Sequence, residues 1–108
     1  MVIIVMACNK QGTSVKVSKT IDRYELVATY PNRKTEKLEK YLAAALGDSI
    51  LHHEQINTGK EIRLANGAVF YLRYNPGKLE MEMLLQKNST IGRTYFDEMS
   101  RSIQDVLK

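Results

Sequence analysis

Hydrophobic and polar residues alternate from Arg23 to Tyr30, so that Tyr24, Leu26, Ala28 and Tyr30 share one side. A period of two is typical of a half-buried strand. Pro31 ends this segment, and Asn32 is a residue type that caps a following helix. Beyond it, apolar residues recur at intervals of three and four, namely Leu38, Tyr41, Leu42, Ala45 and Leu46. This spacing predicts a helix of about four turns that ends at Gly47.

The clearest pattern covers residues 60–87, where three strands are joined by two tight turns. Ile62 and Leu64 lead into Asn66-Gly67, a pair typical of a type I′ hairpin turn. Asn75-Pro76-Gly77 predicts the second turn. The apolar residues that alternate along the last two strands are Phe70, Leu72, Tyr74, Leu79, Met81, Met83 and Leu85. The three strands therefore form an antiparallel meander with one apolar face.

A final helix is expected after Ser89, which can cap its first turn. Its inward stripe consists of Tyr95 or Phe96, Met99, Ile103, and Val106 or Leu107. The predicted element order is β-α-(β)-β-β-β-α, with the bracketed strand at residues 50–56, where alternation is poor. A sheet with one apolar face and two helices with one apolar stripe each predict an α+β fold. We expect a two-layer sandwich, an antiparallel meander sheet with both helices packed on one face.

Composition agrees with an ordinary globular domain. The 108 residues suit one domain, and 44% hydrophobic and 26% charged residues are normal usage. Sixteen Lys and Arg against twelve Asp and Glu give a net charge of +4, with the two signs interspersed. This balance permits an acidic partner or an anionic surface without requiring either. No apolar run approaches the roughly 20 residues that span a bilayer.

Cys8 is the only cysteine, which excludes an internal disulfide and a cysteine-based metal cluster. It follows an apolar run over residues 1–7 and precedes the polar residues 9–14. The order Val5-Met6-Ala7-Cys8 resembles a lipobox, in which a branched apolar residue stands three before the modified cysteine and a small residue directly before it. The polar residues that follow are similar to the tether of a lipidated domain. In this segment the chain resembles short lipoproteins of Bacteroidota.

The resemblance implies three parts: a truncated lipoprotein signal ending in an acylated Cys8 (residues 1–8), a flexible tether (9–18) and a single globular α+β domain (19–108). It also implies a cell-envelope protein anchored to the membrane by lipid. The run nevertheless lacks the positively charged start of a secretory signal. A second interpretation therefore stays open, in which Val2 to Met6 form a short buried strand of a cytoplasmic protein and Cys8 is a small core residue.

The sequence contains no recognisable catalytic constellation, so we expect neither an enzyme nor a cofactor or metal site. His52 and His53 are neighbours, and neighbours on a strand point to opposite faces and cannot easily share a metal ion. Glu80 and Glu82 share an outward face at roughly 7 Å. Because they alternate with Met and Leu on a solvent-facing strand, we interpret them as ordinary surface charge.

The sheet face opposite Phe70 and Leu79 is the best candidate binding surface, since it gathers cations and an aromatic ring. Its candidate residues are Arg63, Tyr71, Arg73 and Lys78. Such a face can stack bases and contact phosphates, but the glutamates of the same strands argue against nucleic acid. The leading hypothesis is a cell-envelope lipoprotein whose non-catalytic domain binds a protein or a small ligand. The alternative is a cytosolic interaction module, either an inhibitor or immunity-type protein or a weak nucleic-acid binder, that uses this face or an edge strand.

Overall fold

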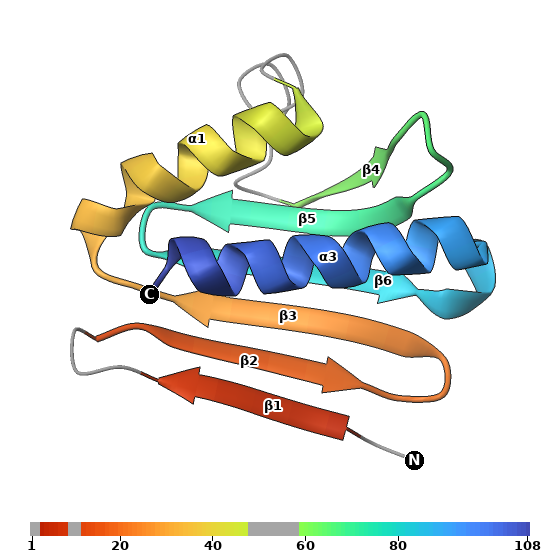
Figure 1. Cartoon of the computed structure of the whole chain (residues 1–108), viewed down its shortest axis with the longest axis horizontal. Coiled ribbons are helices and arrows are strands. Elements are labelled where there is room, and N and C mark those ends of the chain that lie inside the picture. The colour runs from red at the N-terminus through yellow and green to blue at the C-terminus, as the bar shows by residue number, and fades with distance from the viewer. Residues whose placement is uncertain (1–2, 9–11, 48–58) are drawn as a thin grey trace.

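Six strands form one antiparallel sheet in the order β1-β2-β3-β6-β5-β4, and two helices cover one of its faces (Figure 1). The computed structural model describes residues 3–8, 12–47 and 59–108, the first of these ranges by its backbone alone. The strands are β1 (Ile3–Cys8), β2 (Ser14–Lys19), β3 (Arg23–Thr29), β4 (Lys60–Arg63), β5 (Val69–Asn75) and β6 (Lys78–Leu84), and the helices are α1 (Thr35–Leu46) and α3 (Thr90–Val106). This architecture is the α+β sandwich that the sequence predicts.

The core lies between the helices and the inner face of the sheet. Leu26 of β3 stands opposite Met81 of β6 at the centre, and both are buried. The helix α3 turns Phe96 rather than Tyr95 into this core, where its ring meets Tyr24 edge-on at a centroid distance of 4.9 Å and Phe70 at 5.6 Å. The other large apolar residues that the two helices bury are Leu38, Leu42, Leu46, Met99 and Ile103, and Leu107 is buried directly after α3. The predicted apolar faces are therefore the buried ones.

The chain contains the same βββα unit twice. β2 begins at Ser14 and β5 at Val69, β3 at Arg23 and β6 at Lys78, and α1 at Thr35 and α3 at Thr90, so these three counterparts begin 55 residues later. The first strands, β1 at Ile3 and β4 at Lys60, are 57 residues apart. The sheet order is symmetric about the central pair β3 and β6, which run antiparallel. The strands therefore obey an approximate two-fold relation that the residue types do not reveal.

β2 corrects the prediction of a flexible tether. Residues 14–18 form a strand that pairs with both β1 and β3, and Val15 is only 2% exposed. Just before it, Thr13 Oγ1 accepts a hydrogen bond at 2.8 Å from Nζ of the buried Lys34, which also donates to the Leu107 carbonyl at 2.7 Å. The tether prediction is wrong for residues 12–18, because Val15 and Val17 alternate with polar residues as in a half-buried strand. Residues 9–11 lie outside the described residues.

β1 pairs with β2 along its whole length, from Ile3 opposite Lys19 to Cys8 opposite Ser14. It covers most of the strand that the second interpretation of the apolar run expected. The side chain of Cys8 lies outside what the structure describes, so its acylation stays a prediction.

The turn between β4 and β5 differs from the predicted type I′ turn. Gly67 has a φ of 92°, whereas no non-glycine residue among the described residues, Asn66 included, has a positive φ. The Gly67 N–H donates to the Leu64 carbonyl at 3.0 Å, and the Leu64 N–H donates to the Ala68 carbonyl at 2.9 Å. These bonds define a three-residue loop in which only Gly67 takes the left-handed position. The second predicted turn is present, and Gly77 there has a φ of 85°.

The helix ends follow the predictions in part. Ser89 caps α3 by accepting the Gly92 N–H, and Gly47 follows the last turn of α1 with a φ of 96°. Asn32 is not the cap of α1, because it begins a short 3-10 helix (Asn32–Lys34) that leads into α1 at Thr35. A second 3-10 helix (Leu85–Lys87) precedes α3. The strand predicted at 50–56 lies outside the described residues.

Candidate functional site

The outward face of the sheet carries a row of acidic residues interrupted by one tyrosine. Across four adjacent strands, Glu25 stands opposite Glu82, Glu82 opposite Tyr71, and Tyr71 opposite Glu61. The strand alternation that buries Leu26, Met81 and Phe70 turns these residues outward. Tyr71 is 44% exposed, in contrast to its buried neighbour Phe70. We call Glu25, Glu82, Tyr71 and Glu61 the outward row.

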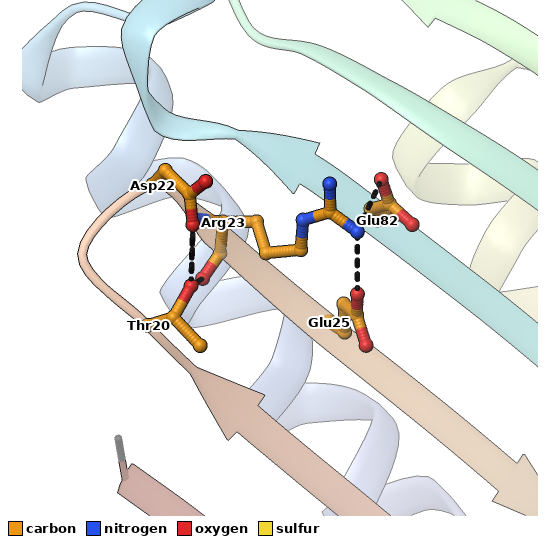
Figure 2. Close-up of polar contacts among 5 residues, drawn as sticks. All are labelled: Thr20, Asp22, Arg23, Glu25 and Glu82. Carbon is orange, nitrogen blue, oxygen red and sulfur yellow. Dashed lines mark hydrogen bonds and ion pairs between the residues drawn. The ribbon is translucent and has the colours of Figure 1, made fainter. Parts of the chain in front are cut away.

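Arg23 lies between the two carboxylates at one end of this row (Figure 2). Its guanidinium contacts Glu25 at 3.4 Å and Glu82 at 3.7 Å. Like charges directly opposite each other on a sheet repel, and the shared arginine offsets that repulsion. The turn before β3 is held by Thr20, whose hydroxyl donates to Asp22 at 2.7 Å and accepts the Arg23 N–H at 3.2 Å. The hydrogen bond from Thr20 lowers the pKa of Asp22.

The predicted candidates Arg63, Tyr71, Arg73 and Lys78 all belong to the outward face. Arg73 and Lys78 lie on β5 and β6 and share Glu80, at 3.7 and 3.2 Å. Arg63 ends β4 and contacts Glu61 at 3.3 Å. Each of these cations is therefore paired with a carboxylate of the same face, and the face is not a basic patch.

Among the hollows that the described residues form on the outward face, two shallow ones are lined by both Tyr71 and Glu82. The larger, of about 350 Å³, is lined by Glu61, Val69, Tyr71, Glu82, Leu84 and Lys87, together with part of Phe70. The smaller, of about 250 Å³, is lined by Glu25, Val27, Tyr71, Glu80, Met81 and Glu82. We call the first the Lys87 hollow and the second the carboxylate hollow. Each combines apolar surface with acidic groups beside one aromatic ring.

The ring of Tyr71 leans over the backbone of Gly59, just before β4. A Cβ at position 59 would lie 1.6 Å from the Tyr71 hydroxyl, and Gly59 has a φ of 95°. Glycine at this position therefore gives the ring the space it occupies. Of these residues, only Tyr71 was predicted from the sequence. Gly59, Arg23 and Glu25 were not predicted, although alternation along residues 23–30 already placed Arg23 and Glu25 outward.

The remaining side chains considered in the sequence are two glutamates and two histidines. Glu80 and Glu82 do point outward, and both form ion pairs with arginine. His52 and His53 lie outside the described residues. In the part of the chain that the structure describes, no three His, Cys, Asp or Glu residues are grouped to hold a metal ion. Over the same residues, no helix has the length and apolar character needed to cross a membrane.

Comparison with protein-family models, with curated proteins and with solved structures finds no match for this chain.

Proposed function

We propose that this protein is a non-catalytic binding domain that takes a partner protein on the outward face of its sheet. The observation that carries the proposal is the exposed ring of Tyr71 between two hollows, on the face opposite the helices. Aromatic residues are enriched at the centres of protein interfaces, where they fill pockets on a partner. Apolar surface around the ring, from Val27, Val69 and Leu84, adds to what a partner would bury.

A protein partner fits this face better than nucleic acid. A phosphate would have to displace Glu80 from Arg73 and Lys78, and Glu61 from Arg63. Nucleic-acid affinity rests mainly on cations that neutralise phosphates, and these cations already contact carboxylates.

Site-directed photo-cross-linking in the native host tests the proposal. A photoreactive phenylalanine derivative replaces Tyr71 in one variant and Glu36 in a matched control, since Glu36 is 82% exposed on α1. We expect a discrete adduct from position 71 and none from position 36. The same adducts from both positions, or none from position 71, would contradict a binding surface on the sheet.

A second candidate function, lipid anchoring through Cys8, is supported by Val5-Met6-Ala7-Cys8 and its resemblance to a lipobox. Cleavage before Cys8 would remove most of β1 and leave β2 at the edge of the sheet. The outward row lies on β3 to β6 and is unaffected by that cleavage. Anchoring and partner binding are therefore compatible.

Metabolic labelling with a fatty acid in the native host tests the anchor. A lipoprotein would incorporate the label, occur in the membrane fraction and begin at Cys8, and Cys8→Ser would abolish all three properties. An unlabelled wild-type protein that retains the residues before Cys8 would rule out the anchor and favour the cytoplasmic alternative.

A further inference from the structure

The carboxylate hollow differs in charge from the protein as a whole. Three of its six lining residues are glutamates, Glu25, Glu80 and Glu82, and its lining contains no cation among the described residues. The whole chain, in contrast, carries a net charge of +4. We infer that this hollow receives an arginine side chain of the partner protein. The inference rests on the function proposed above and specifies the chemistry of the partner.

The arrangement of charge favours a cationic guest. Glu25 and Glu82 face each other across the central strand pair and share Arg23 at 3.4 and 3.7 Å. Two carboxylates with one guanidinium leave one negative charge at this pair. Glu80, the third glutamate of the hollow, is already paired with Arg73 and Lys78, so the negative excess is confined to Glu25 and Glu82. Arg23 is 45% exposed at the rim, and each carboxylate can accept about four hydrogen bonds. A second guanidinium can therefore bind the same carboxylates without displacing the first.

The shape of the hollow selects a long side chain rather than a small cation. Val27 contributes apolar surface beside the glutamates, whereas the Met81 side chain is only 2% exposed and belongs to the core. Arginine and lysine lay their methylene stems along apolar surface while the charged end stays polar. A hydrated metal ion or ammonium ion would gain nothing from contact with Val27.

Tyr71 distinguishes arginine from lysine. Its partly exposed ring lines the hollow beside Glu82, within the same row. A guanidinium stacks on an aromatic face and presents a planar fork to carboxylates, whereas an ammonium does neither as well. The contact with Gly59 restricts the ring before any partner arrives, and such preorganisation reduces the entropic cost of binding.

Nuclear magnetic resonance titration of the full chain tests the inference. The probe is blocked triarginine, with blocked trilysine and triglutamate as comparisons, and the readout is the backbone amide signals of Val27, Tyr71 and Glu80. We expect triarginine to shift these signals in a salt-sensitive manner and more strongly than trilysine. Triglutamate should leave them in place.

The matched variants are Glu25→Gln with Glu82→Gln, against Glu36→Gln on α1. The double variant should weaken triarginine binding at least about tenfold, the effect of losing about 1.4 kcal/mol of binding free energy, while the control binds as the wild type does. If the double variant does not fold, Tyr71→Leu replaces it, with an expected loss of about threefold from the ring contact.

Unchanged affinity in these variants, or equal shifts from triglutamate, would overturn the inference. Failure of triarginine to bind while the position 71 cross-link persists would overturn the arginine assignment alone. Loss of the cross-link as well would overturn the proposed binding surface too.

Discussion

The side-chain amide of Asn88 binds both backbone groups of Val69: its Oδ1 accepts the Val69 N–H at 2.8 Å, and its Nδ2 donates to the Val69 carbonyl at 2.9 Å. The same Nδ2 donates to the Leu84 carbonyl at 2.9 Å. The pairing of β5 with β6 extends as far as Tyr71 and Glu82, and Asn88 bridges the strands beyond that point. Val69 and Leu84 also line the Lys87 hollow. Asn88, which lies between the second 3-10 helix and α3, therefore helps to shape the outward face.

Replacing Asn88 by alanine should destabilise the protein by about 2 to 3 kcal/mol, because the part-buried backbone groups of Val69 and Leu84 lose the three hydrogen bonds of the buried Asn88 side chain. Urea unfolding with linear extrapolation measures the change. Asn66→Ala is the matched control, since exposed Asn66 accepts one bond, from the Ala68 N–H at 2.9 Å. The control should cost about 1 kcal/mol or less. Equal losses of unfolding free energy in the Asn88→Ala and Asn66→Ala variants would show that the Asn88 hydrogen bonds are not a principal contact.

Gly92→Ala should also destabilise the protein, although alanine is the better helix former by about 1 kcal/mol. A Cβ at position 92 would lie 2.9 Å from Asn88 Oδ1 and 3.2 Å from the Ala68 Cα. Crowding of this kind costs about 1 to 3 kcal/mol, which outweighs the gain in helix propensity. Thr94→Ala, at an exposed position of the same helix, should be neutral or slightly stabilising in the same thermal unfolding experiment. A stabilised Gly92→Ala variant would contradict the close approach of α3 to Ala68.

Stability should fall as the pH rises from about 10 to about 12, in part through Tyr24. Burial raises the pKa of Tyr24 to about 12, and its hydroxyl donates to Asp97 at 2.8 Å, which also favours the neutral form. The unfolded chain ionises near the ordinary value of about 10. The stabilisation is therefore complete below pH 10 and is lost as the pH passes through the folded pKa. Tyr24→Phe should lower the melting temperature at pH 8 but reduce its decline between pH 10 and 12. An unchanged decline would contradict the role of Tyr24.

Truncations of the N-terminal segment separate a tether from a structural strand. A chain that begins at Gly12 keeps β2 and should unfold cooperatively. A chain that begins at Lys19 loses Val15 and Val17, which each contribute about 1.5 to 3 kcal/mol by burial, and should not fold stably. Circular dichroism melting curves measure both. Equal melting temperatures for the two truncated chains would restore the tether interpretation.

Local sequence patterns were sufficient to predict the strands and helices that bury one continuous face. Alternation along β3 and β6 identified Leu26 and Met81 as core residues, and helical spacing identified Leu42 and Ile103. These assignments succeed because burial of one face imposes a period of two on a strand and 3.6 on a helix.

β2 could not be predicted in this way, because only two valines mark it among Ser and Lys residues, a composition that also suits a tether. The twofold relation of the halves was hidden for a different reason. Val15 and Phe70 occupy corresponding positions of β2 and β5 but differ in size. Identical residues at the 55-residue offset are few, for example Glu25 with Glu80 and Thr35 with Thr90, so the repeat is not visible as a repeated motif.

The candidate site was predictable one strand at a time. Tyr71 must face outward if Phe70 faces inward, and that prediction is confirmed. The meeting of Glu25 with Glu82 depends on the register between β3 and β6, which are 49 or more residues apart in the chain. Local patterns contain no information on the register between two distant strands. They also do not show which backbone groups the Asn88 amide binds.

The most direct test of the outward face as a binding surface measures both stability and partner binding in one double variant. Tyr71→Ala with Arg73→Ala should unfold within about 1 kcal/mol of wild type, as surface changes usually do, whereas Phe70→Ala should cost about 3 to 5 kcal/mol. The double variant then carries the photoreactive residue in place of Lys87, which is 57% exposed and lines the hollow beside Tyr71. Its adduct yield is compared with that of the same residue in the otherwise unchanged chain. A folded double variant that loses the adduct is the result we predict. A folded double variant that keeps the full adduct yield, or a double variant as unstable as Phe70→Ala, would contradict a binding role for the open sheet face.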